Sequence, residues 1–183
     1  MPKTFKRAAA AGFTLIELLI VVIILAILAA IAIPQFSATS ADAQQAALDA
    51  NLATVRNSLE QYRAQHTGNV YPGANATTGG TCTATKGTGA AGTKQAFEDQ
   101  LKMASDAAGN TCSLADNTYR YGPYLRQGLP AQPIDNNAEV TFTNTGAAIV
   151  ADDKSGWAYD AKSGQFIMNS TKKDPNDKVY STH

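Results

Sequence analysis

A run of apolar residues near the amino terminus restricts the possible folds of this chain more than any other feature does. No side chain from Leu18 to Ile33 is polar. At a rise of roughly 1.5 Å per residue, a helix over residues 13–33 spans about 31 Å, one hydrocarbon thickness of a bilayer. One acid, Glu17, lies within this segment. A carboxylate in lipid costs several kcal/mol unless it is neutralised or paired, so the sequence predicts a membrane helix whose acid has a function.

The basic residues around this segment predict its orientation. Lys3, Lys6 and Arg7 precede it, and the next basic residue is Arg56. By the positive-inside rule the leader stays cytoplasmic and the rest of the chain is exported. A secretory signal places its apolar core before the cleavage site, whereas here Gly12 comes before the apolar run. Cleavage after Gly12 would therefore leave the hydrophobic segment on a mildly acidic mature chain.

A helical pattern continues beyond Pro34. The following segment is rich in alanine, and Gly68 is a plausible helix end. Pro34 lacks a backbone donor, so we expect it to bend or loosen the helix there. Apolar residues recur at spacings of three and four, which predicts one stripe that packs against a globular part. The stripe consists of Leu48, Leu52, Val55, Leu59 and Tyr62.

The amino-terminal pattern resembles that of the type IV pilin and type II secretion pseudopilin family. FTLIELLIVV follows Gly12, Glu17 stands at the family spacing from Phe13, and Pro34 ends the apolar run. The resemblance implies that a prepilin peptidase cuts after Gly12 and methylates the new amine of Phe13. Many family members carry glycine where this chain has Ala26, and their filaments often melt the helix there. Because Ala26 departs from this pattern, the resemblance implies such melting less strongly for this chain.

The same resemblance implies where the subunit resides. It would span the inner membrane once, in contact with lipid and with its carboxyl terminus in the periplasm. An assembly platform and an ATPase would then pull it into a helical homopolymer, a cell-surface or periplasmic filament. Pairing Glu17 with the Phe13 amine of a neighbouring subunit would neutralise two charges that lipid disfavours. A Glu17 that is protonated, or that lies near the membrane interface, is the alternative. Phe13, Glu17 and Pro34 are therefore the predicted assembly residues.

The predicted fold class is α+β, with a long hydrophobic-then-amphipathic helix packed on a small antiparallel β-sheet. Glycine and threonine dominate residues 69–93, which predicts a loop, and a short helix is expected over residues 93–109. Three or four β-strands are expected among AEVTFTN, AAIVADD, GWAYD and GQFIMN. The predicted segments are a leader (1–12), a transmembrane and polymerisation helix (13–33), an amphipathic helix (34–68) and a globular head (69–183).

Two cysteines, Cys82 and Cys112, lie in the part expected to be exported. Disulfides form in oxidising compartments, so one bridge is predicted, with two free thiols as the alternative. On the chain-entropy model a bridge between these positions stabilises the fold by about 3 to 4 kcal/mol.

The composition offers little for catalysis or for nucleic-acid binding. Basic and acidic residues are balanced at 15 each, so no basic patch for nucleic acid is expected. The only histidines are His66 and His183, and no catalytic set or phosphate loop has a supporting context. Asp152 and Asp153 are weak calcium candidates, but without the ladder of an EF-hand a solvated turn is favoured. No cofactor is expected.

The resemblance to pilins implies a structural subunit of a type IV pilus or pilin-like filament, not an enzyme. The alternative is the major pseudopilin of a type II secretion system. A membrane-tethered periplasmic binding protein or enzyme is a distant alternative, because a plain anchor needs no acid at Glu17.

Overall fold

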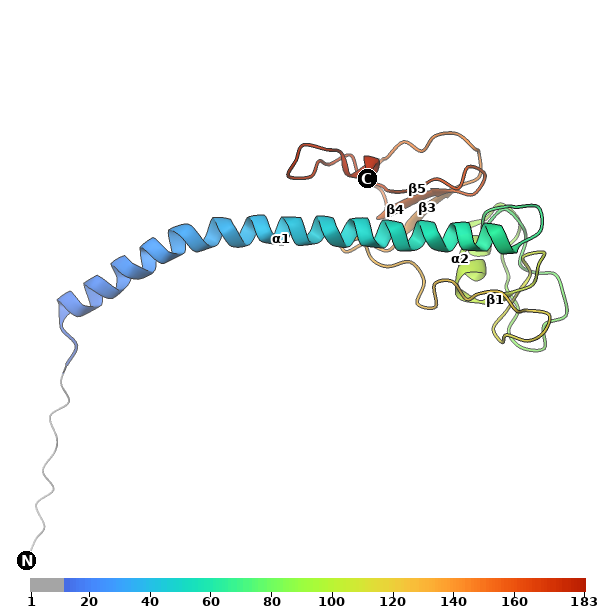
Figure 1. Ribbon diagram of the computed structural model, residues 1–183, viewed down its shortest axis with the longest axis horizontal. Coiled ribbons are helices and arrows are strands. Elements are labelled where there is room, and N and C mark those ends of the chain that lie inside the picture. Colours follow the sequence, from blue (N-terminus) through green and yellow to red (C-terminus); the bar gives the residue numbers. More distant parts are fainter. Residues whose placement is uncertain (1–11) are drawn as a thin grey trace, which may run out of the picture. The chain divides into compact units, whose positions relative to one another are not determined.

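The computed structural model describes residues 12–183, so Lys3, Lys6 and Arg7 of the predicted leader lie outside the described residues. The chain divides into two compact units, Met1–Ala41 and Asp42–His183. Helix α1, Leu15–Gln65, contributes residues to both units (Figure 1).

The remaining elements belong to the second unit. They are α2 (Lys94–Lys102), a two-stranded sheet of β1 (Ala104–Ser105) and β2 (Thr111–Cys112), a three-stranded sheet of β3 (Val140–Thr143), β4 (Trp157–Asp160) and β5 (Phe166–Met168), and the 3-10 helix η1 (Tyr180–Thr182). A long, initially apolar helix followed by small sheets confirms the predicted α+β, pilin-like layout.

The predicted stripe on α1 forms the centre of the core. Its five members are at most 2 % exposed. Leu48, Leu52, Val55 and Leu59 belong to one buried cluster that also contains side chains of α2 and of β4 and β5. Burial of one such aliphatic side chain stabilises the fold by roughly 1.5 to 3 kcal/mol. The partners contributed by the other elements are Phe97, Leu101, Trp157, Tyr159, Phe166 and Met168.

The prediction of an all-antiparallel sheet was wrong in one pairing. β4 and β5 are antiparallel, with Trp157 opposite Met168, but β3 runs parallel to β4, with Val140 opposite Trp157. Residues 147–153, expected as a strand, instead belong to an irregular connection. This connection brings the chain back to the start of the sheet, and such a return is what a parallel pair requires.

One carboxylate holds together the two loops that follow β3 and β4. Asp160 accepts hydrogen bonds from Thr143 Oγ1 (3.0 Å), the Thr145 N–H (2.7 Å), the Gly146 N–H (3.1 Å) and the Ser163 N–H (2.8 Å). Burial raises the pKa of this carboxyl, but the backbone donors together lower it well below its usual range. Because parallel strands end at the same edge of a sheet, one residue reaches both loops.

Helix α2 is shorter than predicted. Thr93 begins it by accepting a hydrogen bond from the Ala96 N–H, a typical N-cap. The helix ends at Lys102 rather than near residue 109, because the chain turns into the β1–β2 hairpin (residues 104–112). Asp106 accepts from two backbone N–H groups in the turn of this hairpin and thereby stabilises the turn against further helix.

Two polar side chains of α2 anchor the glycine- and threonine-rich loop. Gln100 is fully buried; its oxygen accepts from the Gly73 N–H (2.6 Å) and its amide nitrogen donates to the Asn75 carbonyl (3.1 Å). Asp99 accepts from Thr77 Oγ1 (2.9 Å) and from the Gly89 N–H (3.1 Å). The loop thus satisfies buried polar groups although it has no regular secondary structure.

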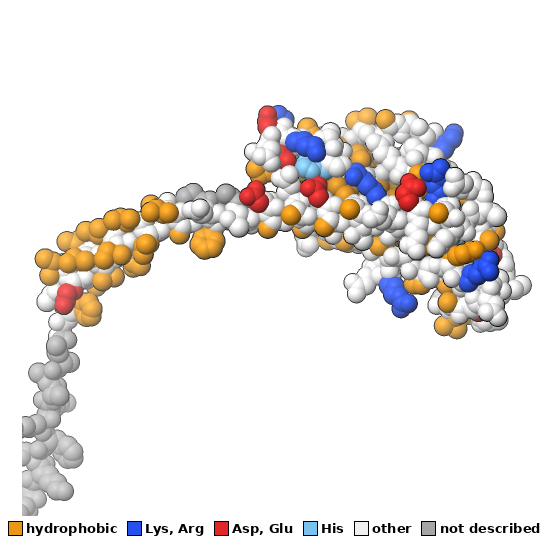
Figure 2. Space-filling model, viewed as in Figure 1, with side chains coloured by type: hydrophobic (Ala, Val, Ile, Leu, Met, Phe, Trp, Pro, Cys, Tyr) orange, Lys and Arg blue, Asp and Glu red, His pale blue; other side chains and the backbone are white. Residues whose placement is uncertain are grey.

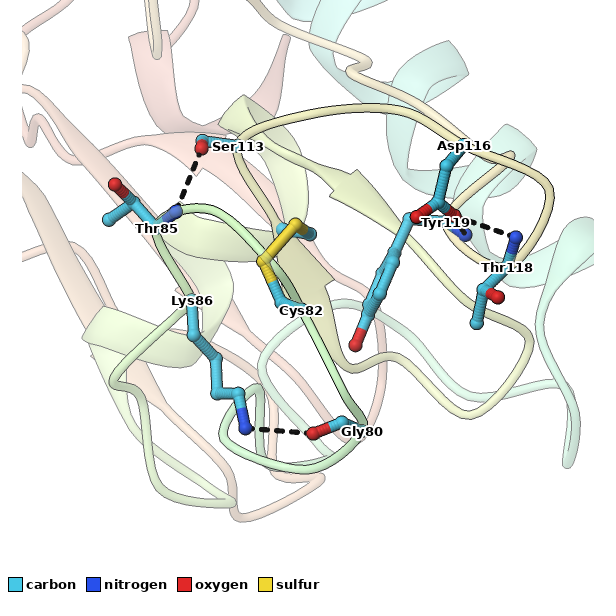
Figure 3. The surroundings of a disulfide bond; sticks show 9 residues. Gly80, Cys82, Thr85, Lys86, Ser113, Asp116, Thr118 and Tyr119 are labelled. Carbon is cyan, nitrogen blue, oxygen red and sulfur yellow. Dashed lines mark hydrogen bonds between the residues drawn. A yellow bond between two sulfur atoms is a disulfide. The ribbon is translucent and has the colours of Figure 1, made fainter.

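The predicted disulfide between Cys82 and Cys112 is confirmed. It joins the same loop to β2, and the Thr85 N–H donates to Ser113 Oγ beside it (3.1 Å; Figure 3). Lys86 Nζ also donates to the Gly80 carbonyl across this part of the loop (2.8 Å). The disulfide therefore closes the section of the loop that α2 does not anchor.

Alkylation of the native protein without reductant is expected to label neither Cys82 nor Cys112. After reduction and denaturation, mass spectrometry should show two labels, and the reduced protein should be less stable by about 3 kcal/mol. A Cys82→Ser variant provides the control, since it leaves one buried thiol, Cys112, that alkylation labels once the protein is denatured. Labelling of both cysteines in the native wild-type protein would contradict the assignment.

Candidate functional site

The first part of α1 presents apolar side chains on all sides. Within unit Met1–Ala41, the large apolar residues from Leu15 to Ile33 are 47–87 % exposed. Figure 2 shows this continuous hydrophobic surface along the amino-terminal part of the helix. The segment Leu15–Ile33 is long and apolar enough to cross a membrane, and none of it is buried within the protein. Such a surface requires lipid or other apolar helices around it.

Glu17 forms a reciprocal cap with Thr14 at the start of this helix. Its Oε2 accepts from the Thr14 N–H (2.8 Å) and from Thr14 Oγ1 (2.6 Å). The Glu17 N–H donates back to Thr14 Oγ1 (3.3 Å). This is the capping-box arrangement, which satisfies backbone donors that the first helical turn leaves free. The acid therefore has a local role in addition to the predicted role in assembly.

The predicted cleavage position lies just before this cap in exposed, non-helical chain. Phe13 is 79 % exposed, and a Cβ at Gly12 would meet nothing within 4 Å. The geometry leaves the peptide bond between Gly12 and Phe13 open to an enzyme. Phe13 directly precedes Thr14, whose N–H the Glu17 carboxylate contacts.

The backbone of α1 is helical at both Ala26 and Pro34. The role of Pro34 in assembly stays a prediction. The same holds for the roles of Phe13 and Glu17.

The two calcium candidates are engaged by protein donors. Asn169 Nδ2 donates to Asp152 (2.7 Å), and this hydrogen bond is the main cause that lowers the pKa of Asp152 to about 2. Asp153 accepts from the N–H (2.8 Å) and the hydroxyl of Thr171. Within residues 12–183, no group of three or more His, Cys, Asp or Glu side chains is arranged to hold a metal ion.

A serine and a histidine meet in the head, but the pair is closed to substrates. His66 Nε2 lies 2.9 Å from Ser105 Oγ, a distance that would suit a nucleophile and its base. Ser105 is 0 % exposed, however, and His66 is 6 % exposed. The contact is therefore structural.

Comparison with known proteins identifies a known motif in the amino-terminal segment. Residues 7–33 match the prokaryotic N-terminal methylation motif, which covers the exposed position Gly12, the capped acid Glu17 and the apolar helix. The protein is type IV pilin-like. A 48-residue stretch of this pilin-like protein is 54 % identical to the type IV narrow pilus major component PilA5 of Thermus thermophilus.

That likeness covers 26 % of the pilin-like chain and 41 % of PilA5, so the match spans about two fifths of its relative. No solved structure matches the pilin-like chain. The sequence interpretation had missed Thr14 as a partner of Glu17. The signal was available, because threonine followed three residues later by glutamate is the sequence pattern of a capping box.

Proposed function

We propose that the protein is a structural subunit of a type IV pilus, polymerised through the apolar part of α1. The observation that carries the proposal is an exposed apolar helix, Leu15–Ile33, with an acid held at its start. In the membrane, lipid covers this surface. In a filament the corresponding helices of other copies replace the lipid, and each copy contributes both a Glu17 carboxylate and a Phe13 amine.

The proposal includes the partners that the motif implies. A prepilin peptidase removes residues 1–12 and methylates Phe13, and an inner-membrane platform with its ATPase drives assembly. The carboxyl-terminal unit faces the periplasm before assembly and the outside of the filament afterwards. The protein has a structural rather than an enzymatic role, as is usual for pilins.

A pilus subunit is favoured over the major pseudopilin of a type II secretion system, because the named relative is a pilus component. Immunogold labelling of whole cells tests this choice. Labelled filaments on the cell surface support a pilus, whereas a subunit confined to the periplasm supports the pseudopilin. A membrane-tethered binding protein or enzyme would form no filament at all.

The mature protein is expected to begin at a methylated Phe13. Mass spectrometry of the amino-terminal peptide from sheared filaments checks this. A Gly12→Val variant is a suitable control, because the structure has open space at this position and the substitution should impede the peptidase without affecting the fold. Filaments that retain residues 1–12 would rule out the proposed processing.

A further inference from the structure

His66 lies in an aromatic enclosure where the carboxyl-terminal end of α1 meets the β1–β2 hairpin. Its ring stacks on Tyr62, with centroids 3.7 Å apart and planes at 13°. Tyr121 and Tyr124, from the segment after β2, have ring centroids at 5.3 and 6.3 Å. Tyr62 is fully buried and His66 nearly so. The imidazole is therefore almost cut off from water.

The hydrogen bonds of His66 identify its tautomer. Nδ1 lies 2.7 Å from the Tyr62 carbonyl oxygen, which can only accept, so Nδ1 carries a proton. Nε2 lies 2.9 Å from Ser105 Oγ on β1, and the neutral ring accepts the serine proton there. A second ring proton would turn Nε2 into a donor. Ser105 would then have to rotate its hydroxyl away inside a fully buried site.

Thr67 also joins the hairpin to the end of α1. The Thr67 N–H and hydroxyl both donate to the Ala107 carbonyl, at 2.8 and 2.5 Å. Ser105 also pairs through its backbone with Tyr121, so the hairpin and the segment after β2 are connected. From this arrangement we propose that His66 is an acid-sensitive contact that fixes the β1–β2 hairpin to the end of α1.

Among the titratable groups near His66, Asp106 carries a charge that favours a second proton on the ring. Tyr62, on α1, and Tyr124 are neutral near pH 6, because burial raises the pKa of both. Asp106 lies in the hairpin turn, where its carboxylate also accepts from Ala108 and Asn110. The ring of Tyr121 is tilted by 56° relative to the imidazole.

Burial lowers the pKa of His66, while its bond to the Tyr62 carbonyl and the charge of Asp106 offset part of that effect. In the detached state the imidazole is solvated and has its ordinary pKa near 6.5. The contact is thus at full strength above about pH 6.5 and weakens as the pH falls below that value. Acid therefore raises the population of the detached hairpin relative to that at neutral pH.

Hydrogen–deuterium exchange of the full-length protein in detergent tests the proposal. Peptides covering residues 104–112 and 156–169 are compared at pH 7.5 and 5.0, after correction for intrinsic exchange rates. We expect protection of the hairpin peptide to fall severalfold in acid relative to the β4–β5 peptide. A His66→Gln variant should show equal hairpin protection at both pH values. An unchanged ratio in the wild type, or the same acid response in the variant, would overturn the proposal.

Direct titration provides a second test that needs no altered His66. The chain has two histidines, so a His183→Gln variant assigns the remaining imidazole signal in an NMR spectrum. We expect a midpoint below 6.5 and nitrogen shifts that report a proton on Nδ1. A midpoint at or above 6.5, or a proton on Nε2 of the neutral ring, would contradict the proposal.

Discussion

Replacing Asp160 by alanine is expected to lower the free energy of unfolding by about 3 to 5 kcal/mol. The carboxylate accepts from the hydroxyl groups of Thr143 and Thr145 and from backbone N–H groups in both loops. Alanine would leave these donors without their acceptor in a site where Asp160 is fully buried. The loops after β3 and β4 would lose their common partner, and the parallel pairing between these strands would weaken.

Urea unfolding followed by the fluorescence of the single tryptophan, Trp157, measures this loss, because the residue is buried in β4 beside Phe166. Asp135→Ala is the matched control. It removes an exposed ion pair with Lys172 (3.0 Å) and should cost less than about 1 kcal/mol. Similar midpoints for the two variants would show that Asp160 does not hold the sheet together. Because the pKa of Asp160 is lowered, its contribution should persist above about pH 4 and fade in stronger acid.

Replacing Glu17 by alanine is expected to reduce the yield of filaments at least tenfold while the subunit still enters the membrane. The substitution removes the costly acid from the bilayer, so insertion should be as efficient as in the wild type. In the proposed filament, however, the amine that cleavage would create at Phe13 of an adjacent subunit would find no opposite charge. An unpaired charge in an apolar surrounding costs several kcal/mol, far more than a tenfold loss of assembly requires. Sheared filaments compared with the membrane pool give the measurement.

Two further variants separate the charge of Glu17 from its cap. Glu17→Gln keeps a side chain that can form the reciprocal bonds with Thr14 but lacks the charge, so it should assemble as poorly as Glu17→Ala. Thr14→Ala keeps the charge and weakens the cap by about 1 kcal/mol, so it should assemble almost normally. If Glu17→Gln assembled normally and Thr14→Ala did not, the cap rather than the charge would set the register of the filament.

Local patterns in the sequence were enough to predict much of the fold. The spacing of Leu48, Leu52, Val55 and Leu59 follows the helical repeat, and this stripe is the buried face of α1. The alternation in residues 156–169 likewise predicted β4, β5 and their inward faces. These features depend on periodicity within one segment, which a single sequence displays.

Other features depended on contacts between distant segments. β3 is parallel to β4 because residues 144–156 bring the chain back to the start of the sheet. Asp160, which hydrogen-bonds the loop after β3, lies in β4, beyond that connection. The end of α2 depends on a turn centred on Asp106, since the residues that follow Lys102 suit a helix by themselves. At the candidate site, the positions of Glu17 and Gly12 were evident from a known pattern. The cap by Thr14 was overlooked although its signal was local.

The pairing of the α1 stripe with β4 and β5 also has a consequence for the order of events during synthesis. Leu48 to Leu59 are made early, whereas Trp157 and Met168, with which they share a core, follow about a hundred residues later. Until those strands have been made, the stripe has no partner from the sheet. A nascent chain therefore exposes two apolar surfaces. Lipid can cover the first part of α1 at once, whereas the stripe becomes buried only after β4 and β5 have been translated.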